Sequence, residues 1–494
     1  MHLPSIDLLV FTIYLLGIIA FGASFYFRKR NSLDYTTGSG KLPAWALGMS
    51  IFATYLSSIS FLALPGNAYS GNWNAFVFSL SIPVAAVFAI LVFVPLYRKL
   101  QSPSAYAYFE ARFGLWARIY ASVCYLLTQM ARMGAILYLL ALPMHLMLGW
   151  SITNIIWITG LGVLLYATLG GLEAVVWTDA IQGILLILGA LACLVFILLE
   201  LPGGLGQFWS EGMTLEKFSL GSYHWSWSES TFWLVLIYGL FINLQNFGVD
   251  QSYIQRYLGA KDMPSAQRST ALGSLLYIPV SLLFFMIGAA LFIYYQSFPD
   301  SIPQDLAAEG DKVFPYFIIN ALPDGITGLL IAGIFAAGMS TLSTSINSSA
   351  TVILEDHVKK YLRPGLTEKE SMKVLYWSSG SIGFLSIWVA IGFNGVESAL
   401  DAWWGLASIF SGGLLGLLFL GLISPKLSKT PAILGVISGL MVIAWVSLAE
   451  FFPQLSFPII HKNWAIVLGT MAIIIMGFFT GILMSKKSTH YLSD

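Results

Sequence analysis

Long apolar segments follow one another along almost the whole chain, separated by shorter polar connections. Most hold about 20 residues with few charges, which is the length of α-helix that crosses a hydrocarbon core of roughly 30 Å. This pattern predicts a polytopic bundle of membrane-spanning helices. Thirteen spans are expected, at about 5–27, 45–66, 76–98, 116–148, 151–170, 175–200, 232–257, 269–296, 325–352, 373–394, 403–424, 430–451 and 463–484.

Two of these spans carry polar residues near their middle. The second reads LGMSIFATYLSSISFLALPGNAYSG, with polar groups from Thr54 to Ser60, and the seventh reads YGLFINLQNFGVDQSYIQRYL, with polar groups from Asn243 to Asp250. Backbone leaves helical geometry inside a membrane only where it lines a cavity, so both are interpreted as broken helices. They lie five spans apart and cross in opposite directions, as inverted five-helix repeats require. The alternative for either span alone is ordinary packing by small polar residues.

The ninth span ends in IFAAGMSTLSTSINSSA, which holds seven hydroxyl side chains in 17 residues. On a helix, Ala337, Ser340, Thr341 and Thr344 share one stripe, and Ser343 lies one step round from it. Hydroxyl and carbonyl oxygens are hard ligands that suit alkali or alkaline-earth ions. A neutral cage with at most one carboxylate favours a monovalent ion, so the segment predicts a sodium site.

Two charged residues inside spans have open interpretations. Asp179, in GGLEAVVWTDAIQGILL, either contributes a carboxylate to the ion cage or caps its helix near the cytoplasmic end, because an unpaired charge in a span is costly. Arg132, in LLTQMARMGAILYLL, either binds an anionic substrate group with two parallel hydrogen bonds or forms a structural ion pair. Asp7, near the outer end of the first span, is expected only to solvate that end.

The composition supports a membrane protein without nucleic-acid or metal partners. Hydrophobic residues make up 57% of the chain and charged residues 10%, whereas a soluble domain carries about a quarter charged residues. The net charge is zero and no basic block is present, so no nucleic acid is expected to bind. Cys124 and Cys193 lie in apolar segments without the spacing of a disulfide framework or a metal site.

The distribution of basic residues predicts the orientation in the membrane. With the N-terminus outside, 20 of the 24 Lys and Arg residues fall in cytoplasmic segments, three in external ones, and Arg132 within a span. This asymmetry follows the positive-inside rule. We therefore expect a plasma (inner) membrane protein with an external N-terminus and a cytoplasmic C-terminus, working as a monomer in the lipid bilayer.

Three longer connections interrupt the run of spans. The external segments 201–231 and 297–324 are each expected to be either a lid over an outer vestibule or an ordinary solvated connector. The cytoplasmic segment 354–372 predicts a charged helical extension that ends in a turn at Pro364 and Gly365.

These features favour a transporter over other classes of membrane protein. The six histidines lie near span ends or in loops, and none neighbours Asp179 in sequence, so an intramembrane enzyme is not expected. A sodium-gated sensor is disfavoured because no signalling domain follows the last span. Proton coupling would require a carboxylate at the centre of the cage, whereas Asp179 lies near one side.

At this level of detail the chain resembles a known family. The segments GLGVLLYATLGGLEAVVWTDAIQG, QSYIQRYLGAKD and FAAGMSTLSTSINSSA resemble the sodium:solute symporter family, and the resemblance covers almost the whole chain. Within that family, FATYLSSISF and QMARMGAILY are similar to the bacterial sialic acid symporters. The resemblance implies an all-α polytopic membrane protein with the LeuT-type fold. Its parts would be an extra N-terminal helix (1–27), a first five-helix repeat (45–200), an inverted second repeat (232–424), and two C-terminal helices with a tail (430–494).

The resemblance also implies two ion sites and a substrate site. Sodium site one would use the carbonyls of Ala53, Leu56 and Ala337 and the hydroxyls of Ser340 and Thr341. Sodium site two would use Asp179, Ser340, Ser343 and Thr344. The substrate residues would be Arg132 for a carboxylate, with Ser57, Ser60, Asn243, Tyr55 and Ser79. Tyr55 stands where the family has a small hydroxyl residue, and Ser79 where it has a glutamine.

The function expected on this basis is sodium-coupled symport by alternating access. The substrate would be sialic acid or a related sugar acid, carried with two sodium ions. The alternative is a sodium-coupled symporter of a neutral sugar or another small organic solute, with Arg132 in a structural role.

Overall fold

A computed structural model describes residues 4–28, 30–394, 413–425, 427–448 and 460–490 of the chain. Within these ranges the regular structure is helical, apart from an isolated bridge between Leu42 and Ala260. The α-helices are α1 (Ser5–Ser24), α2 (Ser32–Thr37), α3 (Ala44–Tyr55), α4 (Ser58–Ser70), α5 (Val77–Leu80), α6 (Ile82–Phe88), α7 (Val94–Leu100), α8 (Ala107–Phe113), α9 (Leu115–Leu148), α10 (Ile152–Glu200), α11 (Gly204–Thr214), α12 (Phe232–Val249), α13 (Gln251–Gly259), α14 (Met263–Ser297), α15 (Gln304–Ala307), α16 (Gly310–Asn320), α17 (Ile326–Val352), α18 (Glu368–Gly392), α20 (Lys429–Leu448) and α21 (Trp464–His490).

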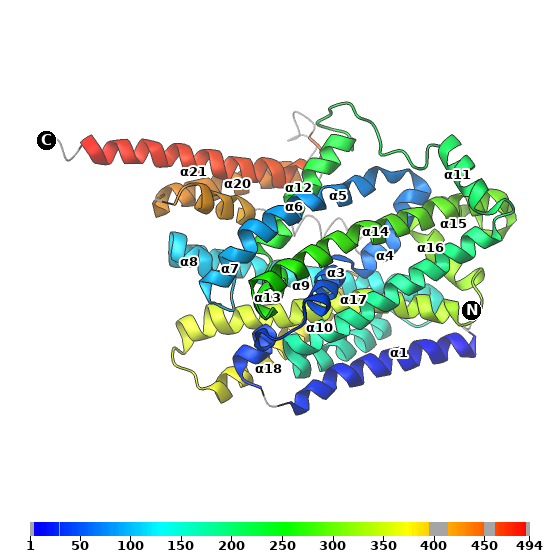
Figure 1. The fold of residues 1–494 in the computed structure, drawn as a ribbon, viewed down its shortest axis with the longest axis horizontal. Coiled ribbons are helices and arrows are strands. Elements are labelled where there is room, and N and C mark those ends of the chain that lie inside the picture. Colours follow the sequence, from blue (N-terminus) through cyan, green and yellow to red (C-terminus); the bar gives the residue numbers. More distant parts are fainter. Residues whose placement is uncertain (1–3, 29, 395–412, 426, 449–459, 491–494) are drawn as a thin grey trace.

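Most of the long helices run along the longest dimension of the molecule, and α1 begins at the opposite end from where α21 stops (Figure 1). Among the described residues, ten helices are long and apolar enough to cross a membrane, or eleven if α3 and α4 count as one bent span. The predicted spans 151–170 and 175–200 both fall in the 49-residue α10, which breaks at Gly171 with φ +63°. Part of the predicted span 403–424 lies outside the described residues, although 413–423 is an apolar helix.

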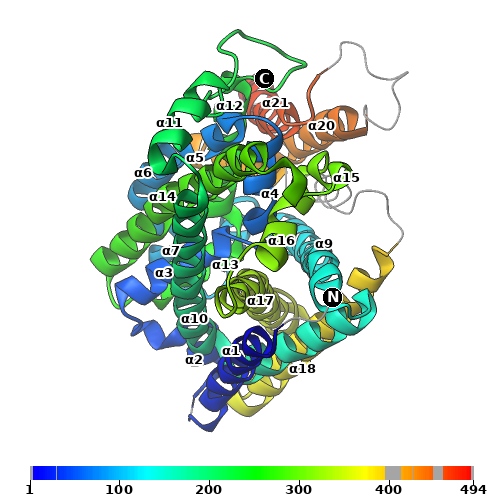
Figure 2. The same ribbon diagram turned by 90° about the vertical axis from the view of Figure 1, so that its right-hand side faces the viewer.

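The ninth predicted span, α17, lies near the middle of the bundle, among α1, α9, α10, α16 and α18 (Figure 2). Apart from Ile326 and Leu329, every residue of α17 is buried. Its hydroxyl groups therefore face protein and not lipid. A π-helical extension, Ile353–Leu362, continues α17, and the turn at Pro364 and Gly365 follows it, as predicted.

The expectation that Asp7 only solvates the outer end of α1 is wrong. Asp7 is 1% exposed, and its Oδ1 accepts hydrogen bonds from the backbone amides of Gly325 at 2.6 Å and Gly328 at 2.7 Å. These amides open α17, where the first turn has no intrahelical acceptors and carries a partial positive charge. Asp7 thus caps the central helix from a neighbouring one.

The segment that follows α11, predicted to be external, is anchored to the broken second span. Lys217 is buried, and its Nζ donates to the carbonyl oxygens of Tyr69 at 2.7 Å and Gly71 at 3.0 Å, at the end of α4. The same ammonium group lies 3.4 Å from the ring centroid of Phe292. Burial lowers the pKa of Lys217 to about 8. This part of 201–231 is therefore not a freely solvated connector.

Candidate ion and substrate sites

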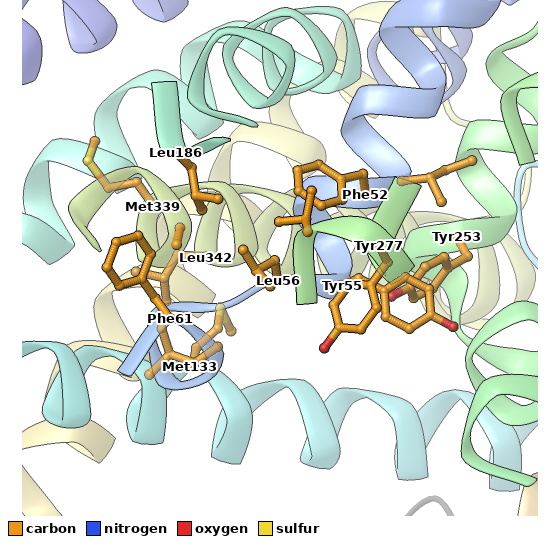
Figure 3. Close-up of a cluster of buried hydrophobic side chains, with 14 of the residues drawn as sticks. Phe52, Tyr55, Leu56, Phe61, Met133, Leu186, Tyr253, Tyr277, Met339 and Leu342 are labelled. Carbon is orange, nitrogen blue, oxygen red and sulfur yellow. The ribbon is translucent and has the colours of Figure 1, made fainter. Parts of the chain in front are cut away.

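The second predicted span is broken, as expected. The helix α3 ends at Tyr55, Leu56 and Ser57 are extended, and α4 starts at Ser58 with an axis bent by 56° from α3. Figure 3 shows apolar side chains from several helices packed around this break, with Leu56 between them. Because a helix end leaves carbonyls without intrahelical donors, the break presents oxygen atoms inside the bundle.

Hydroxyl groups of α17 meet this helix end. Ser340 Oγ lies 3.3 Å from the carbonyl oxygen of Ala53 and 3.1 Å from that of Ala337, and Thr341 Oγ1 donates to the Ala337 carbonyl at 3.1 Å. All four residues are buried. The structure thus brings together four of the five residues predicted for sodium site one. The fifth, Leu56, is buried and extended at the break itself.

Asp179 is fully buried and does not lie at a solvated helix end. Its Oδ2 accepts hydrogen bonds from Ser50 Oγ at 2.5 Å and, at longer distance, Thr344 Oγ1 at 3.4 Å. The guanidinium of Arg256 lies 3.2 Å from the same oxygen through Nη2, which also donates to Thr344 Oγ1 at 2.6 Å. Asp179 Oδ1 has no hydrogen-bond partner within the described parts of the chain.

Arg256 is not expected at this place from the sequence. The positive-inside count assigns it to a cytoplasmic segment and leaves Arg132 as the basic residue within a span, but Arg256 is 0% exposed. The remaining predicted ligands of site two, Ser340 and Ser343, lie on the same helix as Thr344, and Ser343 Oγ donates to the Ser340 carbonyl at 3.1 Å. Arg256 offsets the charge of Asp179 and leaves one carboxylate oxygen without a partner among the described residues.

The seventh predicted span is also broken. The helix α12 ends at Val249 and α13 starts at Gln251, with Asp250 between them in an extended conformation. Asp250 Oδ1 accepts a hydrogen bond from the Ser252 amide at 2.7 Å and so caps α13. Both polar interruptions seen in the sequence are therefore helix breaks.

Arg132 on α9 contacts both breaks. Its Nη2 donates to the carbonyl oxygen of Thr54, near the end of α3, at 3.2 Å. Its Nη1 lies 3.9 Å from Oδ2 of Asp250, longer than the 2.7–2.9 Å of a direct charge-assisted hydrogen bond. The Arg132 side chain keeps 18% of its surface exposed. It is therefore held between the two broken helices, and the described residues do not use all its donors.

The other predicted substrate residues fall into three hydrogen-bonded groups. The Tyr55 hydroxyl donates to Asn243 Oδ1 at 2.6 Å, and Asn243 Nδ2 donates to Ser81 Oγ at 3.0 Å. Ser79 accepts from Ser281 on α14 at 2.8 Å. The amide of Ser60 donates to Ser57 Oγ at 3.4 Å, at the start of α4.

Tyr55 is surrounded by aromatic rings. Its ring centroid lies 5.1 Å from that of Tyr277, 5.2 Å from Tyr253 and 5.6 Å from Phe247. Figure 3 shows Tyr55, Tyr253 and Tyr277 together on one side of the break. The large residue at a position predicted to be small therefore belongs to an aromatic cluster from α3, α12, α13 and α14.

Three residues of these sites are missed by sequence reasoning. Ser50 and Arg256 both contact Asp179, and Asp250 faces Arg132. The sequence marks Asp250 as part of a polar interruption but not as the partner of Arg132. Arg256 follows that break by six residues and stands at the end of the predicted span 232–257, although the count of basic residues places it in the adjoining cytoplasmic segment. A charged residue at that position of a span is a signal that it faces the interior.

Comparison with known proteins identifies relatives over nearly the full length. A model of the sodium:solute symporter family matches residues 35–439. The sodium/sialic acid symporter SiaT of Proteus mirabilis is 32% identical over 487 residues, covering 97% of this chain and 96% of that protein. The sodium/sialic acid symporter NanT of Aliivibrio fischeri is 31% identical, covering 96% and 92%.

The fold also matches that of a solved transporter. A structure of the substrate-bound, outward-open state of a Na+-coupled sialic acid symporter aligns with a TM-score of 0.90 and 30% identity, covering 97% of this chain and 98% of that one. This match confirms the predicted all-helical transporter fold of the LeuT type.

Proposed function

Because this chain belongs to the sodium:solute symporter family, we propose that it carries sialic acid, or a closely related sugar acid, together with two sodium ions. Family membership means that the chain is a sodium-coupled solute symporter, a multi-pass membrane protein and not an enzyme. Sodium is accordingly a co-transported ion and not a cofactor. The substrate and the number of ions are the proposed part.

The position of Arg132 is the observation that supports a substrate with a carboxylate. An arginine near both helix breaks, with donors that have no partner in the described part of the chain, offers a carboxylate the bidentate contact that guanidinium groups make. Tyr55, Asn243, Ser57, Ser60 and Ser79 supply the hydroxyl and amide groups that a polyhydroxylated ring requires. Relatives named for sodium/sialic acid symport support the same substrate class.

The two proposed sodium sites share Ser340. Site one combines Ala53, Leu56 and Ala337 carbonyls with Ser340 and Thr341, across the contact between α3 and α17. Site two combines the unpaired Oδ1 of Asp179 with Ser340, Ser343 and Thr344. A shared ligand couples the occupancy of the two sites.

The proposed transport cycle follows from the placement of these sites. Sodium joins α17 to the broken span α3–α4, the sugar acid binds Arg132, and the bundle rocks to open inward. This cycle assumes thirteen spans, inverted repeats at 45–200 and 232–424, an external N-terminus and a cytoplasmic C-terminus. It needs a single chain in the plasma membrane.

A thermal-shift screen on the purified protein tests this proposal. N-acetylneuraminate and glucose are added in sodium and in choline medium, to the wild type and to Arg132→Gln. We expect sodium-dependent stabilisation by N-acetylneuraminate alone, and a dissociation constant about 100-fold higher in Arg132→Gln, because two charge-assisted hydrogen bonds are lost. Uptake of a neutral sugar that persists in Arg132→Ala would instead support the neutral-sugar symporter.

A further inference from the structure

The two carboxylate oxygens of Asp250 have different roles at the second helix break. Oδ1 is fixed by the Ser252 amide at 2.7 Å, at the start of α13. Oδ2 lies 3.5 Å from Nε2 of Gln129 and 3.9 Å from Nη1 of Arg132. The first oxygen therefore holds the helix, and the second faces the arginine proposed to bind the substrate.

The ion pair of Arg132 and Asp250 has a longer distance and a more exposed carboxylate than two other arginine pairs in the bundle. Arg118 lies 2.6 Å from Asp356 and Arg256 lies 3.2 Å from Asp179, with both carboxylates 0% exposed. The side chains of Arg132 and Asp250 keep 18% and 15% of their surface exposed. At 3.9 Å and partly open to solvent, this pair is held less tightly than the two fully buried carboxylate contacts, so it exchanges partners more easily.

We propose that Asp250 is a positioning residue, the internal counter-ion that holds Arg132 until the carboxylate of the substrate takes its place. The inference rests on the proposed function, because it requires a substrate with a carboxylate. Substrate binding leaves the charge of Asp250 unpaired beside a second anion. A sodium ion bound nearby offsets that charge, so substrate and sodium bind cooperatively.

The helix that Asp250 caps also reaches the second proposed sodium site. The Ser252 carbonyl accepts from Nη1 of Arg256 at 2.6 Å. Arg256 in turn contacts Thr344 Oγ1 at 2.6 Å and Asp179 Oδ2 at 3.2 Å. Because Asp250 and Arg256 belong to the same short helical segment, a shift of its first turn is transmitted to Asp179 and Thr344.

Asp250→Asn separates the charge of this side chain from its capping role, since Asn caps a helix as well as Asp does. Dissociation constants for N-acetylneuraminate and for its uncharged methyl ester are measured by calorimetry in sodium and in choline medium. In choline we expect the variant to bind the acid about two- to fivefold more tightly than the wild type. For the acid, the dissociation constant in choline divided by that in sodium is smaller in the variant than in the wild type. The dissociation constant of the ester is the same in both proteins.

Two control variants accompany this measurement. Glu110→Gln removes a carboxylate that pairs with Arg118 at 2.6 Å, away from the helix breaks, and keeps wild-type constants. Asp250→Glu keeps the charge and the wild-type sodium ratio. Should Asp250→Asn fail to fold, Asp250→Ser replaces it with the same expectations, since Ser also caps a helix.

The outcomes distinguish this inference from the proposed function. Unchanged constants in Asp250→Asn, with normal binding by the wild type, overturn the inference and leave the function standing. Equal tightening for the acid and the ester also overturns it, because Asp250 then acts on pocket shape. A wild type that binds no N-acetylneuraminate in either medium overturns the proposed substrate, and the inference with it.

Discussion

At Ser340, Thr341 and Ser343 the hydroxyl protons are directed to backbone carbonyls of the same helix, at 3.1 Å in each case. A hydroxyl group has one donor and two acceptor lone pairs. A hydroxyl that donates its proton to a carbonyl therefore presents only lone pairs to its other neighbours. Such a surface offers lone pairs to a cation and no hydrogen-bond donor to an anion. This chemistry is the reason for proposing sodium sites on α17.

Thr344 is the hydroxyl that contacts both Asp179 and Arg256, at 3.4 and 2.6 Å. We expect Thr344→Ala to disrupt site two and to leave site one intact, so the Hill coefficient for sodium activation of uptake falls from about two to about one. Sodium titrations of uptake in proteoliposomes measure it. Ser386→Ala, which removes a buried hydroxyl on α18, is the matched control and keeps the wild-type coefficient. An unchanged coefficient in Thr344→Ala contradicts the second site.

At the scale of the elements, α1 determines how the central helix begins. A Cβ at Gly328 would lie 2.7 Å from the Cα of Asp7, which is backbone and cannot turn aside. We expect Gly328→Ala to lower the free energy of unfolding by about 1–3 kcal/mol, as overpacking does. Thermal unfolding in detergent measures this change.

Gly17 provides the matched control for that variant. It lies on α1, where an added Cβ would meet no atom of the described residues within 4 Å, so Gly17→Ala gains helix propensity and leaves stability equal or slightly higher. Equal melting temperatures for Gly328→Ala and Gly17→Ala would contradict the close contact between α1 and α17.

The contact of Lys217 with the end of α4 has a pH dependence. Burial lowers the pKa of Lys217 from 10.5 to about 8, so between these values the unfolded chain binds more protons than the folded one. The contribution of this group to the free energy of unfolding therefore rises with pH from about 8 to about 10.5. We expect the melting temperature of the wild type, relative to Lys217→Met, to increase from pH 8 to pH 10.

The control for the lysine is Lys312→Met, which removes a lysine from an exposed ion pair with Glu309. Its melting temperature is expected to follow that of the wild type across the same pH range. If the melting temperatures of the wild type and of Lys217→Met also change in parallel with pH, burial does not shift the pKa of Lys217.

The sequence predicts local features of the elements better than contacts between them. Both helix breaks are visible because polar residues interrupt apolar spans, and the ladder on α17 because it is dense in hydroxyl groups. The partners of Asp7 and Asp179 are not visible, since Gly328 and Arg256 lie hundreds or tens of positions away in the chain. Predicting them requires knowing which helices pack together, and periodicity alone does not give this.

At the scale of the whole molecule, charge balance distinguishes the stoichiometries. Two sodium ions with a monoanionic sugar acid move one net positive charge, which gains about 2.3 kcal/mol per 100 mV. A tenfold sodium gradient adds about 1.4 kcal/mol per ion. The total of about 5 kcal/mol sustains accumulation of the substrate by a factor on the order of several thousand. One sodium ion moves no net charge and sustains only about a tenfold ratio.

Uptake is therefore expected to respond to membrane potential. In proteoliposomes, a negative-inside potassium diffusion potential of about 100 mV, the size used in that energy figure, should raise the equilibrium accumulation of N-acetylneuraminate. Accumulation that is the same with and without the potential would indicate one sodium ion per substrate.

In the proposed sodium sites, carbonyl oxygens at the α3 break and hydroxyl groups of α17 together replace the water shell of the ion. The most direct test is a sodium titration of the purified protein without substrate, followed by tryptophan fluorescence, for the wild type and Ser340→Ala. Because Ser340 belongs to both proposed sites, we predict saturable binding by the wild type and an affinity lower by about tenfold or more in a folded Ser340→Ala protein. Equal sodium affinities in the two proteins would contradict sodium binding through Ser340.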